Sequence, residues 1–500
     1  MPTDPILTGR IDDDKGRPRN IYTYPDHLAD KSAFGEQMVA ELEPFIQASA
    51  NYDLVPANFR EFSATGGSTG ASGGMFFAQT GTSVGGYGAI QSFRSLNYKA
   101  GQGGTARFTG LFTTGVANSW QGVGLISVGD ELSFGYNGTD FGVWHRYGGL
   151  PEIRTVTVTG AAGGSENLTL TLNGTGFTIP LTNGPTEHNA WEIADWINGD
   201  ATAGALWHAD NVDSTVIITA LSDGAKSGTY SFVSSTATGT IAQTTAGVTK
   251  TSTHIPQTTW NLNTFDDLDP TKGNVFEISY QYLGFGAITF SIEDPETGAF
   301  IAAHRIQYPN ANTTPSLGNP SLRLGLYAVS LGSTTDLTVK SASMAGYIQG
   351  IAAKTRNPRA VDHTQSLGNS AETTLIALRC RKTYNGKFNQ VEIEPELLTI
   401  ANEGSKNVKI KVRASTDPGV ELQYTAAGTN LVSDVATDSQ TFSSGRVLAS
   451  TVVAGGDNIS IDLMKLQIRM PPTLHLIVTG FKSSGSSADV TASLTYYEDL

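Results

Sequence analysis

Serine in a Gly-x-Ser-x-Gly pattern is the first candidate for chemistry in this chain. The pattern occurs at Gly66-Gly-Ser68-Thr-Gly70 and again around Ser72, four residues later. A nucleophilic serine of this type needs a strand before it and a helix after it, because the strained turn between them exposes the hydroxyl. Here both serines lie in a tract of Gly, Ser and Thr, which predicts a long turn over residues 65–74. We therefore expect no catalytic serine.

Paired carboxylates are the second candidate, because glycoside hydrolysis needs two carboxyl groups about 5 to 10 Å apart. Asp266, Asp267 and Asp269 lie in a predicted turn, and Glu277 and Glu293 lie in separate predicted strands. No spacing in the sequence directs two of these carboxyls into one cleft. We therefore expect structural or solvated roles, no catalytic residue and no enzyme activity, and keep a polysaccharide-cleaving enzyme as the alternative.

Metal and cofactor sites are not indicated either. The 8 histidines show no paired spacing, and Cys380 is the single cysteine, which excludes a cysteine-rich zinc site. The run Asp12-Asp13-Asp14 lacks the alternating ligands and distal Glu of a calcium loop. We expect no metal ion and no cofactor, and we expect a buried structural thiol at Cys380.

Aromatic side chains could stack on sugar rings, with Asn, Asp and backbone groups hydrogen-bonding the hydroxyls. The candidates for contact with a glycan are Trp120, Trp144, Tyr147 and Trp260. Against this, Trp and Tyr in sandwich strands usually belong to a core or an interface. The core interpretation is the stronger of the two, and glycan contact stays a hypothesis.

Charge and composition exclude several classes of partner. The formal net charge is -14, whereas binding phosphates requires a clustered excess of Lys and Arg, so we expect no nucleic-acid partner. No apolar run approaches the roughly 18 to 20 residues of a membrane span, and the polar start does not resemble a signal peptide. The 56 glycines beside many Ser and Thr predict a turn-rich β protein that folds in a cytoplasm.

The first part of the chain divides into an arm and a strand-rich region. Residues 1–44 read as an arm that orders on a partner, with a short helix over residues 31–43 that ends at Pro44. Residues 45–154 and 256–350 carry period-2 alternation, as in Ala106 and Phe108 against Arg107 and Thr109. We predict one antiparallel β-sandwich, of concanavalin type, split by an insertion.

The insertion spans residues 155–255 and has the order ββαββ. Asn173-Gly174 marks a hairpin, and Asn189-x-x-Glu192 predicts a cap for a helix over residues 190–198, with Gly199 as its end. Residues 351–368 read as a linker. Residues 369–500 repeat short strands and predict a second sandwich of jelly-roll type. The fold class is thus mainly β: two sandwiches and a small α+β module.

Three runs carry a resemblance to a known class of protein. They are residues 268–293, which hinge on Leu283-Gly-Phe-Gly286, then residues 134–146, and the closing residues 488–500. Together they resemble virion structural proteins of aquatic tailed phages and of some large DNA viruses. The ββαββ pattern likewise resembles small modules that recur in phage tail and fibre proteins.

This resemblance implies a non-enzymatic virion protein assembled in the host cytoplasm and present in several copies. We expect a homotrimer in a tail or fibre that takes part in host attachment, anchored to other virion proteins through the N-terminal arm, with a host surface glycan as a further partner. A capsid decoration or head-fibre protein is the alternative, followed by a polysaccharide-binding or depolymerising virion enzyme.

Overall fold

The structure is a computed structural model that describes residues 7–12, 18–22, 43–56, 58–350, 358–369, 371–428, 431–482, 484–485 and 487–498. The chain forms two compact units. Unit 1 comprises Met1–Tyr147 and Ser252–Ala352, and unit 2 comprises Gly148–Thr251 and Ala353–Leu500. Within the predicted arm, β1 (Leu7–Asp12) pairs with β2 (Pro18–Tyr22). The predicted helix over residues 31–43 lies, apart from Glu43, outside the described residues.

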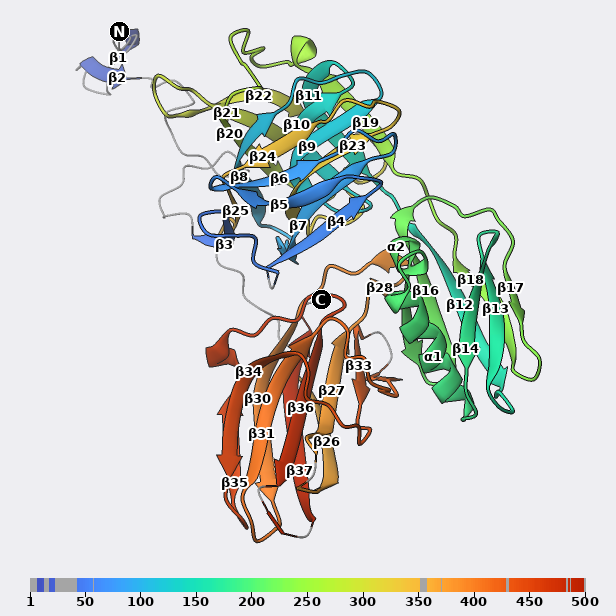
Figure 1. Cartoon of the computed structure of the whole chain (residues 1–500). Helices are drawn as coiled ribbons and strands as arrows, with labels where there is room; N and C mark the ends of the chain where they lie inside the picture. Colours follow the sequence, from blue (N-terminus) through green and yellow to red (C-terminus); the bar gives the residue numbers. More distant parts are fainter. Residues whose placement is uncertain are drawn as a thin grey trace. The chain divides into compact units, whose positions relative to one another are not determined.

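Unit 1 is the split sandwich, made of two antiparallel sheets (Figure 1). Its 7-stranded sheet has, in spatial order, β19 (Thr251–Pro256), β11 (Asp140–Tyr147), β10 (Glu131–Asn137), β9 (Ser119–Ile126), β23 (Arg323–Ser330), β7 (Tyr87–Ser95) and β4 (Phe59–Ala64). Its 9-stranded sheet runs β22 (Phe300–Ile306), β21 (Ile288–Glu293), β20 (Asn274–Gln281), β8 (Gly103–Phe112), β24 (Thr338–Ser341), β6 (Met75–Gln79) and β5 (Ser68–Ser72), with β25 (Ser343–Ile348) and β3 (Pro44–Ser49) off this path. A short 3-10 turn covers Gln257–Thr259.

The core of unit 1 follows from strand alternation. Phe276, Ile278 and Tyr280 of β20 are fully buried between the sheets, whereas Glu277 faces outward and pairs with Arg107. A fully buried side chain of this size contributes about 1.5–3 kcal/mol relative to an exposed one. The two halves of the chain that the insertion separates therefore share one core.

The 9-stranded sheet forks along β8. One edge of β8 pairs with β20, while the other edge pairs with β25 over Gly104–Phe108 and with β24 at Leu111–Phe112. Strand β3 pairs with β25 and extends that branch. The fork leaves room beside β25 for a groove, described below.

The insertion is a small two-sheet module with one helix packed on it. Its sheets have the orders β15 (Trp207–Val212), β16 (Thr215–Asp223), β12 (Pro151–Gly160), β18 (Thr238–Thr245), and β14 (Thr175–Leu181), β13 (Glu166–Leu172), β17 (Ser231–Val233). Helix α1 (Thr186–Gly199) packs on β15, β12, β14 and β16, and α2 (Ala203–Leu206) follows it.

Helix α1 begins four residues before the predicted start. Pro185, in extended conformation, precedes its first turn, and the helix ends at Gly199 with Asp200, not Gly199, as its C-cap. Asn189 is not a cap. Its side chain is buried inside the helix and bonds the Ala162 amide and the Thr182 carbonyl.

The rest of unit 2 is the C-terminal sandwich. One sheet runs β26 (Pro358–Leu367), β37 (Ala488–Glu498), β30 (Ile393–Asn402), β35 (Asn458–Asp462), and the other runs β32 (Thr425–Ala426), β33 (Ser433–Ala436), β27 (Thr373–Cys380), β36 (His475–Lys482), β31 (Val408–Ser415), β34 (Arg446–Val453). A small hairpin of β28 (Thr383–Tyr384) and β29 (Lys387–Phe388) and a 3-10 turn at Met464–Leu466 complete it.

The predicted fold class is confirmed: antiparallel sheets form two sandwiches and a small α+β module. Besides the start of helix α1, two local expectations differ from the structure. The predicted linker contains β26, whose Leu367 is fully buried in the C-terminal core. The tract around Ser68 and Ser72 forms β5, which pairs with β6, in place of a long turn.

Candidate functional site

The four aromatic residues predicted to contact a glycan all lie in unit 1, where Trp120 and Trp144 are neighbours and Tyr147 and Trp260 contact other rings. Trp260 is 5% exposed and packs in the core, edge-on to Phe134 at 6.1 Å between ring centroids. Trp144 is 3% exposed. Trp120 and Tyr147 are half-buried. Contact between these side chains and a glycan stays a prediction, and Trp120 and Tyr147 are the two with ring surface free to make it.

Trp120 and Trp144 meet on the outer face of the 7-stranded sheet, with ring centroids 5.9 Å apart. The guanidinium of Arg146 lies 3.7 Å above the Trp144 ring and 4.6 Å from the Trp120 ring. His254 covers Trp144 from another side, at 4.5 Å between centroids. These contacts occupy the Trp144 face with protein groups.

Two glycines allow other groups to approach strands β9 and β11 closely. A Cβ at Gly122 would lie 2.6 Å from the Tyr327 ring, and one at Gly142 would lie 2.2 Å from the Ile255 carbonyl oxygen. Both distances are shorter than any tolerated contact, so only glycine fits there. Gly122 in β9 thus leaves room for the Tyr327 ring, and Gly142 in β11 lets the backbone at Ile255 approach closely. The sequence analysis missed these glycines.

Arg146 also anchors a buried network. Its Nη1 donates to Glu131 Oε2 at 2.8 Å and to the Tyr327 hydroxyl at 3.1 Å, and the Tyr327 hydroxyl donates to Glu131 Oε1 at 2.8 Å. Burial alone would lower the pKa of Arg146, but the Glu131 carboxylate raises it. Burial raises the pKa of Tyr327 well above its ordinary value. The arginine is therefore charged and the phenol neutral.

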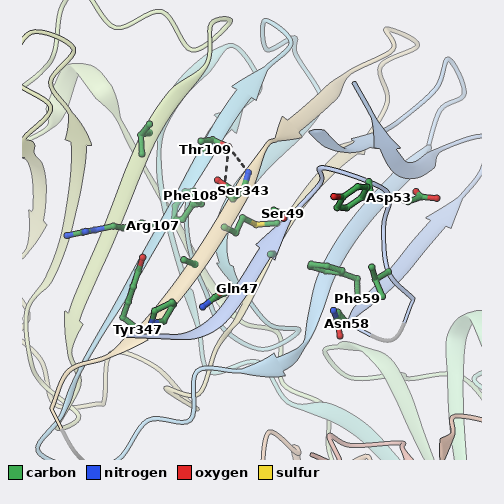
Figure 2. A pocket seen from close by; sticks show the side chains of 17 residues that line it. Gln47, Ser49, Asp53, Asn58, Phe59, Arg107, Phe108, Thr109, Ser343 and Tyr347 are labelled. Atoms are coloured by element: carbon green, nitrogen blue, oxygen red, sulfur yellow. Dashed lines mark hydrogen bonds between the residues drawn. The ribbon is translucent and has the colours of Figure 1, made fainter. Parts of the chain in front are cut away.

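A groove of about 640 Å³ lies beside the fork of the 9-stranded sheet. In Figure 2, Arg107, Gln47 and Tyr347 lie toward one end, Asp53, Asn58 and Phe59 lie toward the other, and Thr109 and Ser343 lie between them. Pro44, Ala48, Ser49, Tyr52, Val55, Phe108, Val275, Met344 and Ala345 complete the lining.

The groove has little of the chemistry of an active site. Arg107 Nε donates to Glu277 at 2.7 Å, and its guanidinium lies 4.9 Å from the Phe300 ring and 5.8 Å from the Tyr347 ring. Among the described lining residues, Asp53 is the one carboxylate. A mixed apolar and amide surface of this kind can bind, but it offers no pair of acids.

In unit 2, a buried charge cluster joins the module to the C-terminal sandwich. Arg379 Nη2 donates to Asp434 Oδ2 at 2.8 Å and to the Asn211 carbonyl at 2.8 Å, and its Nη1 lies 3.6 Å from Asp210 Oδ1. Arg381 Nε donates to Asp434 Oδ1 at 2.7 Å. Burial would raise the pKa of Asp210, but Arg379 holds it well below its usual range.

The cluster includes a neutral histidine. The Tyr424 hydroxyl and His475 Nδ1 are 2.6 Å apart, and Arg379 lies 4.0 Å from the Tyr424 ring centroid. Burial of the ring is the larger cause, and the positive charge of Arg379 the next, of a pKa for His475 that is lowered to about 3. The imidazole is therefore neutral at neutral pH and accepts a hydrogen bond from the Tyr424 hydroxyl.

Other sequence candidates take structural positions. Cys380 is fully buried, as predicted, and burial raises the pKa of its thiol well above the ordinary value. In the described part of the chain, no three His, Cys, Asp or Glu side chains gather closely enough to hold a metal ion. No helix there is both long and apolar enough to cross a bilayer.

Comparisons with known proteins give no family. No family model matches the chain, and no curated protein matches it. Among solved structures, the Emp46p carbohydrate recognition domain aligns over 63% of this chain and 100% of its own, with a TM-score of 0.25 and 8% identity. Lectin II from Ulex europaeus aligns over 62% and 100%, with a TM-score of 0.20 and 7% identity.

A triple jelly-roll protein from the turret assembly of an archaeal virus aligns over 93% of this chain and 98% of its own. Its TM-score is 0.17 and its identity 7%. At such values these likenesses say nothing of what this chain binds or where it works.

Proposed function

We propose that the chain is a non-enzymatic structural protein of a virus particle, present as a homotrimer in the tail or a fibre and engaged in host attachment. Its N-terminal arm docks on neighbouring virion proteins, and its β domains project from the particle. The alternative location is the capsid exterior, where the chain would be a decoration or head-fibre protein. No cofactor is required in either place.

The runs that carry the resemblance are framework strands. Residues 268–293 contain β20 and β21, and residues 134–146 contain most of β10 and β11, so both runs build the core of unit 1. The closing run forms β37, a central strand of its sheet. A likeness concentrated in core strands supports a shared scaffold more than a shared reaction.

The observation that carries the proposal is the placement of the buried charges. Glu131 of β10 pairs with Arg146 of the neighbouring β11, and Asp434 of β33 pairs with Arg379 of the neighbouring β27 and with the half-buried Arg381. None of these five residues lines the groove. Enzymes gather ionisable groups with displaced pKa values in a cleft. Here these five charged groups pair with one another and hold segments of the chain together, which supports a structural role.

Two measurements on purified material test this. Light scattering at micromolar concentration should give the mass of a trimer, and peptide mass spectrometry of purified particles should find this chain at a copy number divisible by three. A monomer, or absence from particles, would contradict the proposal.

The competing enzyme hypothesis has its own test. Incubating the protein with host-surface polysaccharides should release no reducing ends. Release that disappears in Asp53→Asn, the variant of the groove carboxylate, would replace the structural role with a depolymerase.

A further inference from the structure

The turn between β20 and β21 holds an exposed residue in a strained conformation. Leu283 has a φ of +35°, in the left-handed region that side chains other than Gly rarely adopt. Leu283 is 57% exposed and Phe285 is 40% exposed. Two large apolar side chains are thus exposed to solvent, and the backbone conformation of one of them, Leu283, is energetically unfavourable.

The turn is rigidly built. A Cβ at Gly286 would lie 1.6 Å from the Gln281 carbonyl oxygen, so this position accepts only glycine. The Ser316 amide donates to the Gly284 carbonyl at 2.8 Å, and the Tyr98 hydroxyl accepts from the Leu283 amide at 3.1 Å. The surrounding loops therefore fix the direction in which the turn presents its side chains.

Behind the turn lies a row of rings. Phe285 is 6.3 Å from Tyr308, Tyr308 is 6.1 Å from His145, and His145 stacks on Tyr147 at 4.7 Å, all between ring centroids. Tyr308 and His145 are buried, while Phe285 and Tyr147 reach solvent. The two buried rings thus support the exposed Phe285 and the half-buried Tyr147, and Tyr147 is one of the residues predicted to contact a glycan.

The polar groups beside these rings are largely uncharged. Burial lowers the pKa of His145, and its Nε2 lies 2.7 Å from the Ser316 carbonyl oxygen, so the ring is neutral and donates there. The adjacent loop exposes the amides and hydroxyls of Asn310, Asn312, Thr313 and Thr314. Exposed rings beside neutral donors and acceptors make a surface of mixed character.

We propose that the surface formed by the exposed Leu283 and Phe285 and the half-buried Tyr147, named here the turn surface and supported from below by the buried Tyr308 and His145, binds the pyranose rings of a neutral glycan. A pyranose has an apolar face of C–H groups for the exposed rings and hydroxyls for the flanking amides. A stacked nucleic acid is disfavoured, because the chain has a formal net charge of -14. The proposal rests on the attachment role given above and supplies the class of receptor.

The test is binding of the full chain to an array of neutral and sialylated glycans, followed by calorimetry with the best neutral oligosaccharide. We expect neutral glycans to bind. Phe285→Ser should weaken the affinity at least tenfold, whereas Phe285→Trp should preserve it. Leu331→Ser serves as the matched control, since Leu331 is an apolar residue of unit 1 with 50% exposure that lies away from the turn.

Thermal unfolding of each variant confirms that the fold is intact, and Phe285→Trp separates loss of stacking from loss of structure. No neutral glycan bound by the unaltered chain, or equal affinity in Phe285→Ser, would overturn the proposal. Particle association is measured separately. A chain found in particles that binds no glycan removes this inference alone, and a chain that binds glycan but is missing from particles removes the proposed function alone.

Discussion

The cores of the two sandwiches are built from different side chains. The split sandwich packs aromatic rings against one another, with Phe134 and Phe276 stacked at 4.4 Å and Phe290 edge-on to Phe134 at 5.5 Å. The main core of the C-terminal sandwich consists mostly of Leu, Ile and Val and includes one ring, Tyr496, while a smaller second cluster contains Tyr424 and Phe442. Buried charges, led by Arg379, accompany this aliphatic core.

This difference sets how each region responds to its surroundings. Ring packing depends on shape and apolar area, whereas a buried ion pair depends on both partners keeping their charge. Unit 1 also contains a buried ion pair, Glu131 with Arg146, but the Arg379 cluster in addition holds the inserted module against the C-terminal sandwich. Unit 2 should therefore be the part of the molecule more sensitive to single charge changes.

The largest expected effect is that of Arg379→Met. Removing this guanidinium leaves Asp210 and Asp434 buried near each other, and loss of one partner of a buried pair costs about 3–5 kcal/mol. Urea unfolding of the full chain should show an early transition for unit 2. Lys465→Met, at a side chain 83% exposed, should change stability by less than about 0.5 kcal/mol. Equal effects of the two variants would show that the cluster contributes nothing.

Acid should destabilise unit 2 by the next largest amount. His475 has a pKa of about 3 in the folded chain against 6.5 when unfolded, so the unfolded state binds more protons between these values. Stability is then fullest above pH 6.5 and falls by a few kcal/mol as the pH drops toward 3. His475→Gln should flatten this slope in unfolding free energies measured from pH 7 to 4. An unchanged slope would contradict the assignment.

Below pH 4.5 a second group adds to the loss. Burial alone would raise the pKa of Glu372, but hydrogen bonds from Arg413, Lys411 and Thr479 lower it to about 2. Its stabilisation is present above the unfolded pKa near 4.5 and disappears as the pH falls toward 2. Glu372→Gln should reduce the slope of the unfolding free energy against pH in that range, as measured by circular dichroism. Above pH 5 the slope should be the same as in the unaltered chain.

A smaller effect is expected in the aromatic core. Phe276→Leu removes ring contacts without removing a charge, and we expect a loss of about 1–2 kcal/mol. This loss should be the same at pH 7 and pH 5. A cost that changes with pH would mean that the two cores do not differ in the way described.

The smallest change concerns the turn surface. Leu283→Gly relieves a left-handed backbone that costs about 1–2 kcal/mol, while the added freedom of the unfolded chain takes back about 0.4–1 kcal/mol. Thermal unfolding should show a change within about 1 kcal/mol, in the stabilising direction. A marked loss would mean that the Leu283 side chain, although exposed, stabilises the fold.

Much of the fold could be predicted from alternation alone. The strand expected near residues 275–282 is β20, and Ala106 and Phe108 face the core as their spacing required. The sequence predicted helix α1, but the helix begins earlier than predicted, because its first turn follows Pro185 and Asn189 does not cap it. Local patterns predict local elements well.

The charge cluster and the turn surface could not be predicted in this way. Asp210 and Arg379 belong to segments far apart in the chain, and neither has neighbours in sequence that signal an ionic contact. The ring row likewise joins His145 and Tyr147 to Phe285 and Tyr308 across separate loops. Tyr147 had been named as a candidate for glycan contact and residues 283–286 as the hinge of a run that carries the resemblance, but nothing in the sequence showed that they lie close together.

The most direct test of the virion assignment is immunogold electron microscopy of intact particles, with antibody against the C-terminal sandwich. The account predicts label at the tail end or on fibres. Label spread over the head would move the protein to the capsid exterior, and particles without label would contradict the assignment.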